Sequence, residues 1–178
     1  MIVPAIELVS VNDAATRQAA RDLIGEYLRW IASAAAASYG LSFDVDAMVA
    51  SDIEEAKFYP PSGRFYLINR DGSHVGVGCL KGITSSVAEI QRMYVQPDVR
   101  GVGAGRLLLQ QLLSDGRAIG YHTVRLESLK FLSAAHALYK SVGFTEITPY
   151  AENSMTKYQP PDTMDRYRSS AVFMELRL

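Results

Sequence analysis

A glycine-rich segment, Arg100-Gly101-Val102-Gly103-Ala104-Gly105, constrains the fold of this chain more than any other feature. It follows a β-type run at Val87–Val95 and opens a helical run that extends to about Ile119. A glycine-rich turn between a strand and a helix presents free backbone N–H groups and the positive end of the helix dipole, and both suit a phosphate. Glycine also adopts positive φ freely and has no Cβ to keep a ligand away. The segment therefore predicts a turn whose main chain holds the pyrophosphate of a nucleotide or coenzyme.

Two common phosphate-binding patterns do not fit this turn. A Walker A loop requires GxxxxGK[ST], and the sequence contains no such string. A dinucleotide fingerprint requires GxGxxG, but its third glycine position falls on Arg106 when counted from Gly101 and on Leu108 when counted from Gly103. The pattern that fits is [RQ]xxGx[GA]. Its constraints are loose, so an ordinary helix start with strain-relieving glycines is the alternative at this level.

The sequence on both sides of the turn carries further motifs. Before it stand Ala88-Glu89-Ile90-Gln91-Arg92-Met93-Tyr94-Val95 and Gln96-Pro97, and after the helix stands Ala135-x-x-Leu138-Tyr139-x-x-x-Gly143-Phe144. The order of strand, glycine turn, helix, strand and a short helix ending in LYxxxGF is highly specific. In this order and spacing, residues 88–144 resemble the core of the GNAT superfamily of N-acetyltransferases. Residues 65–83 match that family more loosely.

The resemblance implies an α/β fold in a single N-acetyltransferase domain over residues 1–178. We expect a GNAT-like mixed, mostly antiparallel sheet of about seven strands flanked by helices, and a chain of 178 residues suits one domain. Patterning predicts strands at 6–11, 65–69, 74–83, 87–95, 123–129, 144–148 and 171–177. It predicts helices between Asp13 and Gly40 and at 46–56, 103–119 and 133–142. About 20 polar residues at 151–170 join the last two strands, as a functional cover, a dimer contact or disorder.

The resemblance also implies that acetyl-CoA is the co-substrate. In the family, the pantetheine arm lies between two splayed central strands and pairs with backbone at the positions of Met93, Tyr94 and Val95. A plain core strand explains the same apolar side chains. The pyrophosphate would be held by Arg100, Gly101, Val102, Gly103, Ala104 and Gly105. Arg106 would add a charged contact, or it is a solvated helix arginine.

Acetyl transfer to an amine requires removal of a proton from the acceptor. A lysine-like ammonium has a pKa near 10.4, so only about one molecule in 2,500 is nucleophilic at pH 7. By resemblance to the histone-modifying branch of the family, Glu89 is the general base, directly or through water. A strand carboxylate paired with Lys81 or Arg92 is the alternative. Tyr139 matches the family's general acid for the leaving thiolate, and a buried helix aromatic is its alternative.

The acceptor side is less defined by the sequence. Leu132 stands where many relatives carry an asparagine that helps to hold pantetheine. Glu127 and Ser128 end a strand, where they either face the acceptor or satisfy the strand end. An acidic stretch would attract a cationic amine or form a solvated helix face. Its members are Asp44, Asp46, Asp52, Glu54 and Glu55.

Charge and composition bear on the expected partners. A net charge of −1 offers no field for nucleic acid or an anionic membrane, and no apolar run approaches the length of a membrane span. The single cysteine, Cys79, excludes an intrachain disulfide and fits a reducing, cytoplasmic location. No motif predicts a metal. A homodimer is an assembly that the resemblance allows.

We therefore expect an acetyl-CoA-dependent N-acetyltransferase that acts directly on a small-molecule amine. Three alternatives remain at this level. The first is a non-catalytic acyl-CoA-binding sensor on the same fold, and the second is an acetyltransferase for protein lysines or N-termini. The third is a nicotinamide-dependent enzyme, which the missing third glycine disfavours.

Overall fold

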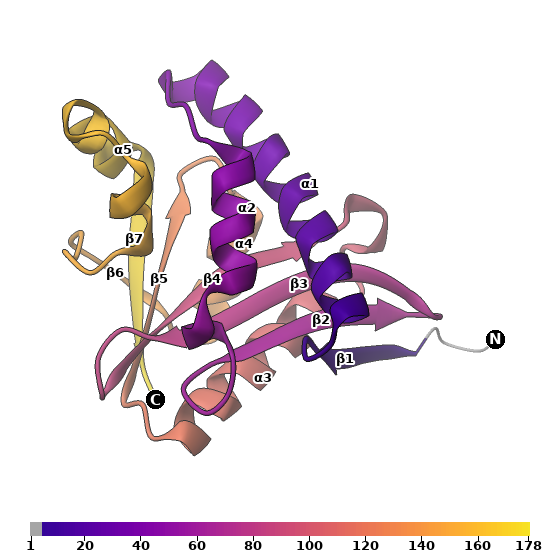
Figure 1. The fold of residues 1–178 in the computed structure, drawn as a ribbon. Helices are drawn as coiled ribbons and strands as arrows, with labels where there is room; N and C mark the ends of the chain where they lie inside the picture. Colours follow the sequence, from indigo (N-terminus) through magenta and orange to yellow (C-terminus); the bar gives the residue numbers. More distant parts are fainter. Residues whose placement is uncertain (1–4) are drawn as a thin grey trace.

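The computed structural model describes residues 5–178 and contains one seven-stranded sheet in the order β1-β2-β3-β4-β5-β7-β6 (Figure 1). Neighbouring strands are antiparallel, except that β4 and β5 are parallel. The expected mixed, mostly antiparallel sheet is therefore confirmed. The strands are β1 (Ile6–Ser10), β2 (Arg64–Arg70), β3 (Ser73–Gly82), β4 (Val87–Val95), β5 (Thr123–Leu129), β6 (Thr145–Ile147) and β7 (Ala171–Arg177).

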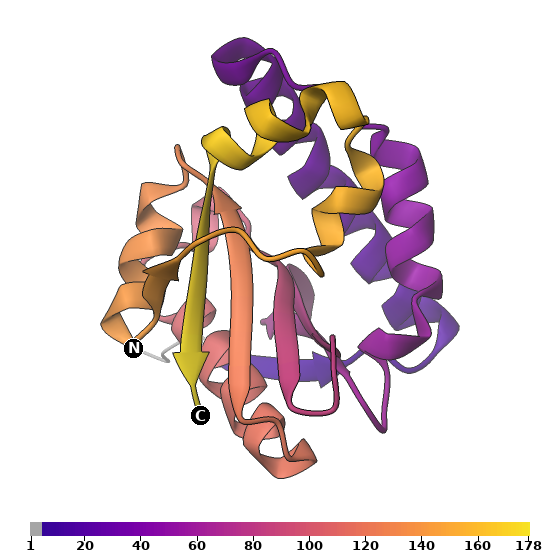
Figure 2. The same cartoon turned by 90° about the vertical axis from the view of Figure 1, so that its left-hand side faces the viewer.

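Helices cover both faces of the sheet (Figures 1 and 2). The α-helices in the described residues are α1 (Ala14–Tyr39), α2 (Val45–Glu54), α3 (Ala104–Ile119), α4 (Ser133–Ser141) and α5 (Met164–Ser170). Short 3₁₀ turns are η1 (Ala56–Phe58), η2 (Pro97–Val99), η3 (Ser154–Tyr158) and η4 (Pro161–Thr163). Because side chains alternate along a strand, Leu67 packs into the core under α1 and α2 while Ile68 packs under α3. No helix in this part of the chain has the length and apolar character needed to cross a bilayer.

The ends of α1 follow from local sequence. Asp13 is the N-cap, and its carboxylate accepts a hydrogen bond from the Thr16 N–H at 2.8 Å in a capping box. At the other end, Gly40 takes a left-handed conformation with φ 63°, which ends the helix as predicted. The expected apolar stripe, which includes Leu23, Ile24 and Leu28, is buried.

The turn between β2 and β3 also forms as the Asp-Gly signal predicts. Asp71 has φ 52° and Gly72 has φ 84°. Two consecutive positive φ values are the requirement of a tight two-residue hairpin turn, which glycine meets at no steric cost.

Residues 151–170 form η3, η4 and α5 rather than a structureless connection. Figure 2 shows this segment arching from the sheet edge to α1 and α2. Met155 and Tyr167 are buried in the same core as the inner faces of those helices. These ordered, packed elements do not fit disorder, so a functional cover and a dimer contact are the two roles left for this segment.

Candidate active site

The central strands β4 and β5 separate along their length. They pair only from Val87↔Thr123 to Glu89↔Arg125, so the remainder of β4 has no partner on that side. On its other side, β4 carries a bulge opposite Gly78, between the pairs Val77↔Tyr94 and Cys79↔Gln91. Such an extra residue bends a strand. The bend and the lost pairing open the sheet at its centre.

A cavity of about 540 Å³ lies in this opening. Its wall includes backbone of β4, the glycine turn, the start of α3, the end of β5 and α4. Of the residues predicted to bind the coenzyme, Val102 alone is not on the wall, and its side chain is 53% exposed. The predicted residues on the wall are Met93, Tyr94, Val95, Arg100, Gly101, Gly103, Ala104, Gly105 and Arg106.

The glycine turn has the backbone that the motif requires. Gly101 has φ 82° and Gly103 has φ 89°, a region that side chains with a Cβ rarely adopt. A Cβ added at either glycine would meet no protein atom within 4 Å. Space beside the turn is therefore open to a ligand. Because α3 begins immediately after Gly103, the N–H groups of its first turn have no intrahelical acceptor and are available to an anion.

The two arginines of this region have protein partners. Arg100 Nε donates to the Val95 carbonyl at 2.8 Å, and its guanidinium lies 5.6 Å from the ring centre of Trp30. Arg106 Nη2 donates to Ser141 Oγ at 2.8 Å. Both side chains are exposed at the mouth of the cleft, where their charge favours an anionic ligand.

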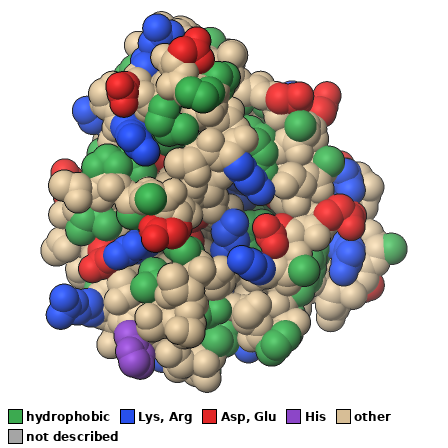
Figure 3. All heavy atoms as spheres, turned by 60° about the vertical axis from the view of Figure 1, so that its left-hand side comes forward, with side chains coloured by type: hydrophobic (Ala, Val, Ile, Leu, Met, Phe, Trp, Pro, Cys, Tyr) green, Lys and Arg blue, Asp and Glu red, His purple; other side chains and the backbone are tan. Residues whose placement is uncertain are grey.

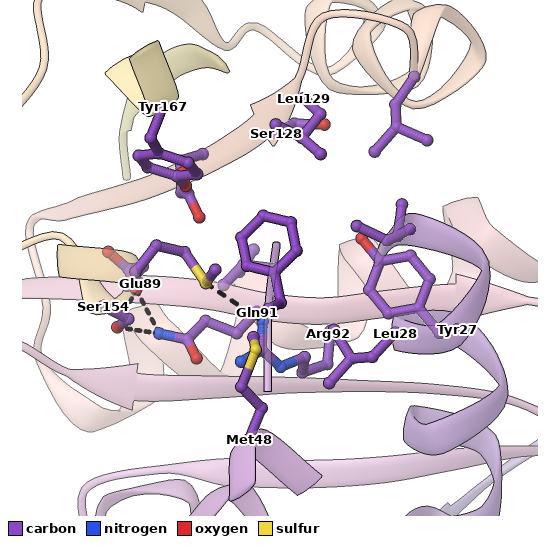
Figure 4. Close-up of a pocket in the computed structure, with 16 residues that line it drawn as sticks. Tyr27, Leu28, Met48, Glu89, Gln91, Arg92, Ser128, Leu129, Ser154 and Tyr167 are labelled. Atoms are coloured by element: carbon purple, nitrogen blue, oxygen red, sulfur yellow. Dashed lines mark hydrogen bonds between the residues drawn. The ribbon is translucent and has the colours of Figure 1, made fainter. Parts of the chain in front are cut away.

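A second, smaller cavity of about 60 Å³ lies under α1, α2 and the segment 151–170 (Figure 4). It meets the large cleft, because seven residues line both. These are Tyr27, Ile90, Gln91, Arg92, Glu127, Ser128 and Leu132. After the ligands that the sequence leads us to expect, we refer to the small cavity as the acceptor pocket and to the large one as the coenzyme cleft.

Glu89 is fully buried and lines the acceptor pocket. Its carboxylate accepts hydrogen bonds from the Gln91 amide and the Ser154 hydroxyl (Figure 4). It also accepts a hydrogen bond from the Tyr150 hydroxyl at 2.8 Å. Neither alternative ion pair forms in the described structure, since Lys81 lies 4.0 Å from Glu55 and Arg92 lies 2.5 Å from Asp52. Three donors thus hold the Glu89 carboxylate in place.

Glu127 is a site residue that sequence reasoning left undecided. It lines both cavities, and its Oε2 atom is buried without a hydrogen-bond partner. Burial of the carboxyl, together with the nearby charge of Glu89, raises the pKa of Glu127 to about 8. The residue as a whole is only half-buried, because part of it faces the cavities. In the sequence, this role is indicated only by the position of Glu127 near the end of β5, the strand that separates from β4.

Tyr139 lies on α4 and lines the coenzyme cleft but not the acceptor pocket. It is 7% exposed, and burial raises the pKa of its phenol, so the hydroxyl stays protonated at neutral pH. The two predicted catalytic residues therefore face different cavities. Glu89 faces the acceptor pocket, whereas Tyr139 faces the cleft.

The acidic stretch does not form an open rim. Asp52 is buried against Arg92, the Asp44 carboxylate caps α2 by accepting from the Ala47 N–H at 3.0 Å, and Glu55 approaches Lys81. Asp44, Asp46 and Glu54 are exposed. Among residues 5–178, no group of three histidine, cysteine, aspartate or glutamate side chains is placed to hold a metal. Cys79 is buried, and burial raises the pKa of its thiol.

Comparison with known proteins agrees with this architecture. Residues 17–144 match the model of the acetyltransferase (GNAT) family. An uncharacterized N-acetyltransferase of Escherichia coli is 32% identical over 117 residues, which cover 62% of this chain and 70% of the relative. A second one, from Schizosaccharomyces pombe, is 34% identical over 100 residues, which cover 54% of this chain and 61% of the relative.

Solved structures show the same fold along nearly the whole chain. The putative acyl-CoA N-acyltransferase of Klebsiella pneumoniae aligns with a TM-score of 0.64 and 26% identity, covering 98% of this chain and 97% of that one. The PaiA N-acetyltransferase of Thermoplasma acidophilum, solved in complex with coenzyme A, aligns with a TM-score of 0.68 and 17% identity over 98% and 99% of the two chains. The chain therefore belongs to the GNAT family of acetyltransferases.

Proposed function

We propose that this protein transfers the acetyl group of acetyl-CoA directly to the amine of a small molecule. The observation that carries the proposal is the junction of the coenzyme cleft with the acceptor pocket at Gln91, Arg92, Glu127 and Ser128. A thioester brought along β4 and an amine held beside Glu89 and Glu127 would meet there. Holding both reactants in one geometry is itself a large part of catalysis.

The open edge of β4 supports binding of pantetheine by main chain. The Gln96 N–H donates to the Val75 carbonyl at 2.9 Å. Because backbone groups alternate in direction along a strand, the N–H and C=O of Val95 point the opposite way, and the C=O, which accepts from Arg100 Nε, keeps a second lone pair for a ligand. Pantetheine amides can pair with such groups as an added strand does. The pyrophosphate would then reach the glycine turn and the start of α3.

The two carboxylates of the acceptor pocket support proton removal. Glu89, directly or through a water, is the proposed base. Glu127 assists it. Its pKa of about 8 lies closer to the pKa of an ammonium than the pKa of an ordinary glutamate does, so transfer of the acceptor proton to it is less unfavourable. Their charges are coupled, so the proton belongs to the pair rather than to either residue. The free amine nitrogen attacks the thioester carbonyl, a C–N bond forms and the C–S bond breaks.

Tyr139 supports departure of the thiolate. Its protonated hydroxyl is on the wall of the cleft and can donate to the sulfur as charge develops. A covalent acyl-enzyme is not proposed, because the only cysteine, Cys79, is buried and its raised thiol pKa disfavours the nucleophilic thiolate. The reaction yields an amide and free coenzyme A. The single buried thiol also supports a reducing, cytoplasmic setting.

The size of the acceptor pocket supports a small molecule. The pocket is about 60 Å³ and is roofed by Met155 and Tyr167 of the segment 151–170. In Figure 3, acidic and basic side chains are interspersed on the face of the molecule that is in view. Such a mixture of charges does not favour binding of a polyanion. The names of relatives do not decide the acceptor, since they include an IAA acetyltransferase, N-acetylaspartate synthetases and a mycothiol acetyltransferase.

Two measurements test the proposal. Calorimetry should show binding of acetyl-CoA and none of NAD, and a thiol-release assay should show turnover with at least one small primary amine. Failure to bind acetyl-CoA would remove the coenzyme assignment. Binding without turnover on small amines or lysine peptides would identify a sensor. Turnover on lysine peptides alone would show that the acceptor is a protein.

A further inference from the structure

Resting on the proposed function, we infer that the acceptor is a small primary amine with an apolar substituent and no carboxylate. This inference names the kind of molecule that the acceptor pocket selects. It depends on the charges that line the pocket, on the side chains that form its walls, and on its volume.

The charges of the pocket favour a cation. Glu89 and Glu127 are the carboxylates on its wall, and Arg92 is the only cation on the wall within residues 5–178. Both Nε and Nη2 of Arg92 contact Asp52, at 2.5 and 3.3 Å, so the Asp52 carboxylate neutralises the charge of Arg92. Its Nη1 faces only the Met155 sulfur at 3.9 Å.

A carboxylate on the acceptor would lie near the carboxylate of Glu89, and the one cation on the pocket wall in the described residues, Arg92, is already paired with Asp52. Lys81 lies opposite Glu89 across β3 and β4, but it is not on the pocket wall and approaches Glu55 instead. Burying an unpaired charge is strongly unfavourable, and a neighbouring like charge adds to the cost. Above pH 8, where Glu127 is ionised, an ammonium can instead pair with its Oε2, which accepts no hydrogen bond in the structure.

Apart from Gln91, Ser128 and Ser154, aliphatic, sulfur-containing and aromatic side chains form the remaining wall of the pocket. Leu28 and Ile31 come from α1, Phe43 and Met48 from the start of α2 and the loop before it, and Met155 and Tyr167 from the covering segment (Figure 4). At about 10–15 Å³ for each water-sized group, 60 Å³ has room for about four to six heavy atoms. A branched alkyl chain of that size would bury its surface against these side chains.

Four acceptors separate charge from size in a thiol-release assay with acetyl-CoA. Isoamylamine carries the apolar group without a carboxylate, leucine adds the carboxylate, leucinamide matches leucine in size without the charge, and ethanolamine lacks the apolar group. We calculate kcat/KM from the concentration of the unprotonated amine. On this basis, we expect kcat/KM to be at least about 30-fold higher for isoamylamine and leucinamide than for leucine. We expect isoamylamine to exceed ethanolamine by at least about 10-fold. Leucine as good as leucinamide, or ethanolamine as good as isoamylamine, would overturn the inference.

Variants of the charged residues give a second test. Asp52→Asn releases Arg92, and at pH 9, above the Glu127 pKa of about 8, Glu127→Gln removes an anion. Each should therefore lower the ratio of isoamylamine to leucine affinity, measured at pH 9 by calorimetry on the protein loaded with coenzyme A, by at least about 5-fold. Asp46→Asn, an exposed residue of the same helix as Asp52, is the matched control and should leave the ratio unchanged. If Asp52→Asn does not fold, Glu127→Gln alone decides. An unchanged ratio in the folded variants would contradict the charge argument.

Failure of the proposed function would be recognised separately. If no acceptor is acetylated, calorimetry on the protein loaded with coenzyme A compares binding of isoamylamine and leucine directly. Tighter binding of isoamylamine by at least about 30-fold supports the inference without turnover. Equal binding, or binding of neither molecule, overturns it.

Discussion

Replacement of Glu127 by glutamine should change how stability depends on pH. Burial and the charge of Glu89 raise the pKa of the Glu127 carboxyl from 4.5 to about 8 in the folded protein. Below pH 4.5 both the folded and the unfolded states carry the proton, so the residue contributes no pH dependence. Between pH 4.5 and 8 the unfolded state loses its proton while the folded state keeps it. The free energy of unfolding therefore falls as pH rises through this window.

The magnitude follows from the same values. A difference of about 3.5 pKa units at 1.36 kcal/mol each sets an upper limit of about 5 kcal/mol above pH 8. Because Glu127 is only half-buried and lines two cavities, we reduce this to about 1–3 kcal/mol. Glutamine resembles the protonated carboxyl and does not titrate. Glu127→Gln should therefore be nearly neutral at pH 5 and stabilising by about 1–3 kcal/mol at pH 9.

Urea denaturation at pH 5, 7 and 9 measures this effect. Glu54→Gln, which changes an exposed carboxylate on α2, is the matched control and should give a nearly constant difference from the unmodified protein. The same Glu127→Gln protein should lose turnover, since the carboxylate pair takes the acceptor proton. Stability curves that stay parallel for Glu127→Gln and the unmodified protein across the three pH values would refute the raised pKa and the division of roles built on it.

Three further substitutions test the coenzyme cleft and the catalytic groups. Gly103→Val should lower acetyl-CoA affinity by at least about 10-fold in calorimetry, because the valine side chain would occupy the ligand's space. Gly120 has a similar φ of 106° but lies outside the cleft, so Gly120→Val should leave the affinity unchanged. Tyr139→Phe should lower kcat by about 100-fold with coenzyme affinity retained, and an unchanged kcat would remove the hydroxyl from the chemistry. Glu89→Gln should reduce turnover most at low pH, where the acceptor is most protonated, and a pH profile like that of the unmodified protein would make this carboxylate structural.

Features set by neighbouring residues were predictable from the sequence. The capping box of α1 depends on Asp13 and Thr16, three positions apart, and the β2–β3 turn depends on Asp71 and Gly72. The glycine turn before α3 is also local, since its conformation requires only glycine at two positions of positive φ. In each case the residue type that makes the conformation favourable lies within the element itself.

The acceptor pocket was not predictable in the same way, because its contacts join residues far apart in the chain. Glu89 receives hydrogen bonds from Tyr150 and Ser154, which lie 61 and 65 positions away. Arg92 pairs with Asp52 across 40 positions. No periodicity or turn signal indicates which carboxylate a distant arginine will neutralise. The sequence could therefore indicate acidic residues near an acceptor wall without showing which of them remain free.

The bulge in β4 connects the coenzyme cleft with the acceptor pocket. Gly78 lies opposite it, and a Cβ there would stand 2.7 Å from Leu108 of α3, so glycine lets the helix pack closely at this point. Arg92, on the bulged strand, takes φ 54° and directs its guanidinium to Asp52 on α2. The distortion that opens one edge of β4 thus also places Arg92 against Asp52, and we infer that this pairing leaves the described pocket wall without a free cation. A bulge could open the cleft without pairing Arg92 with a buried aspartate. Because the structure has this pairing, we expect the preference for the charge of the acceptor to follow from the fold itself.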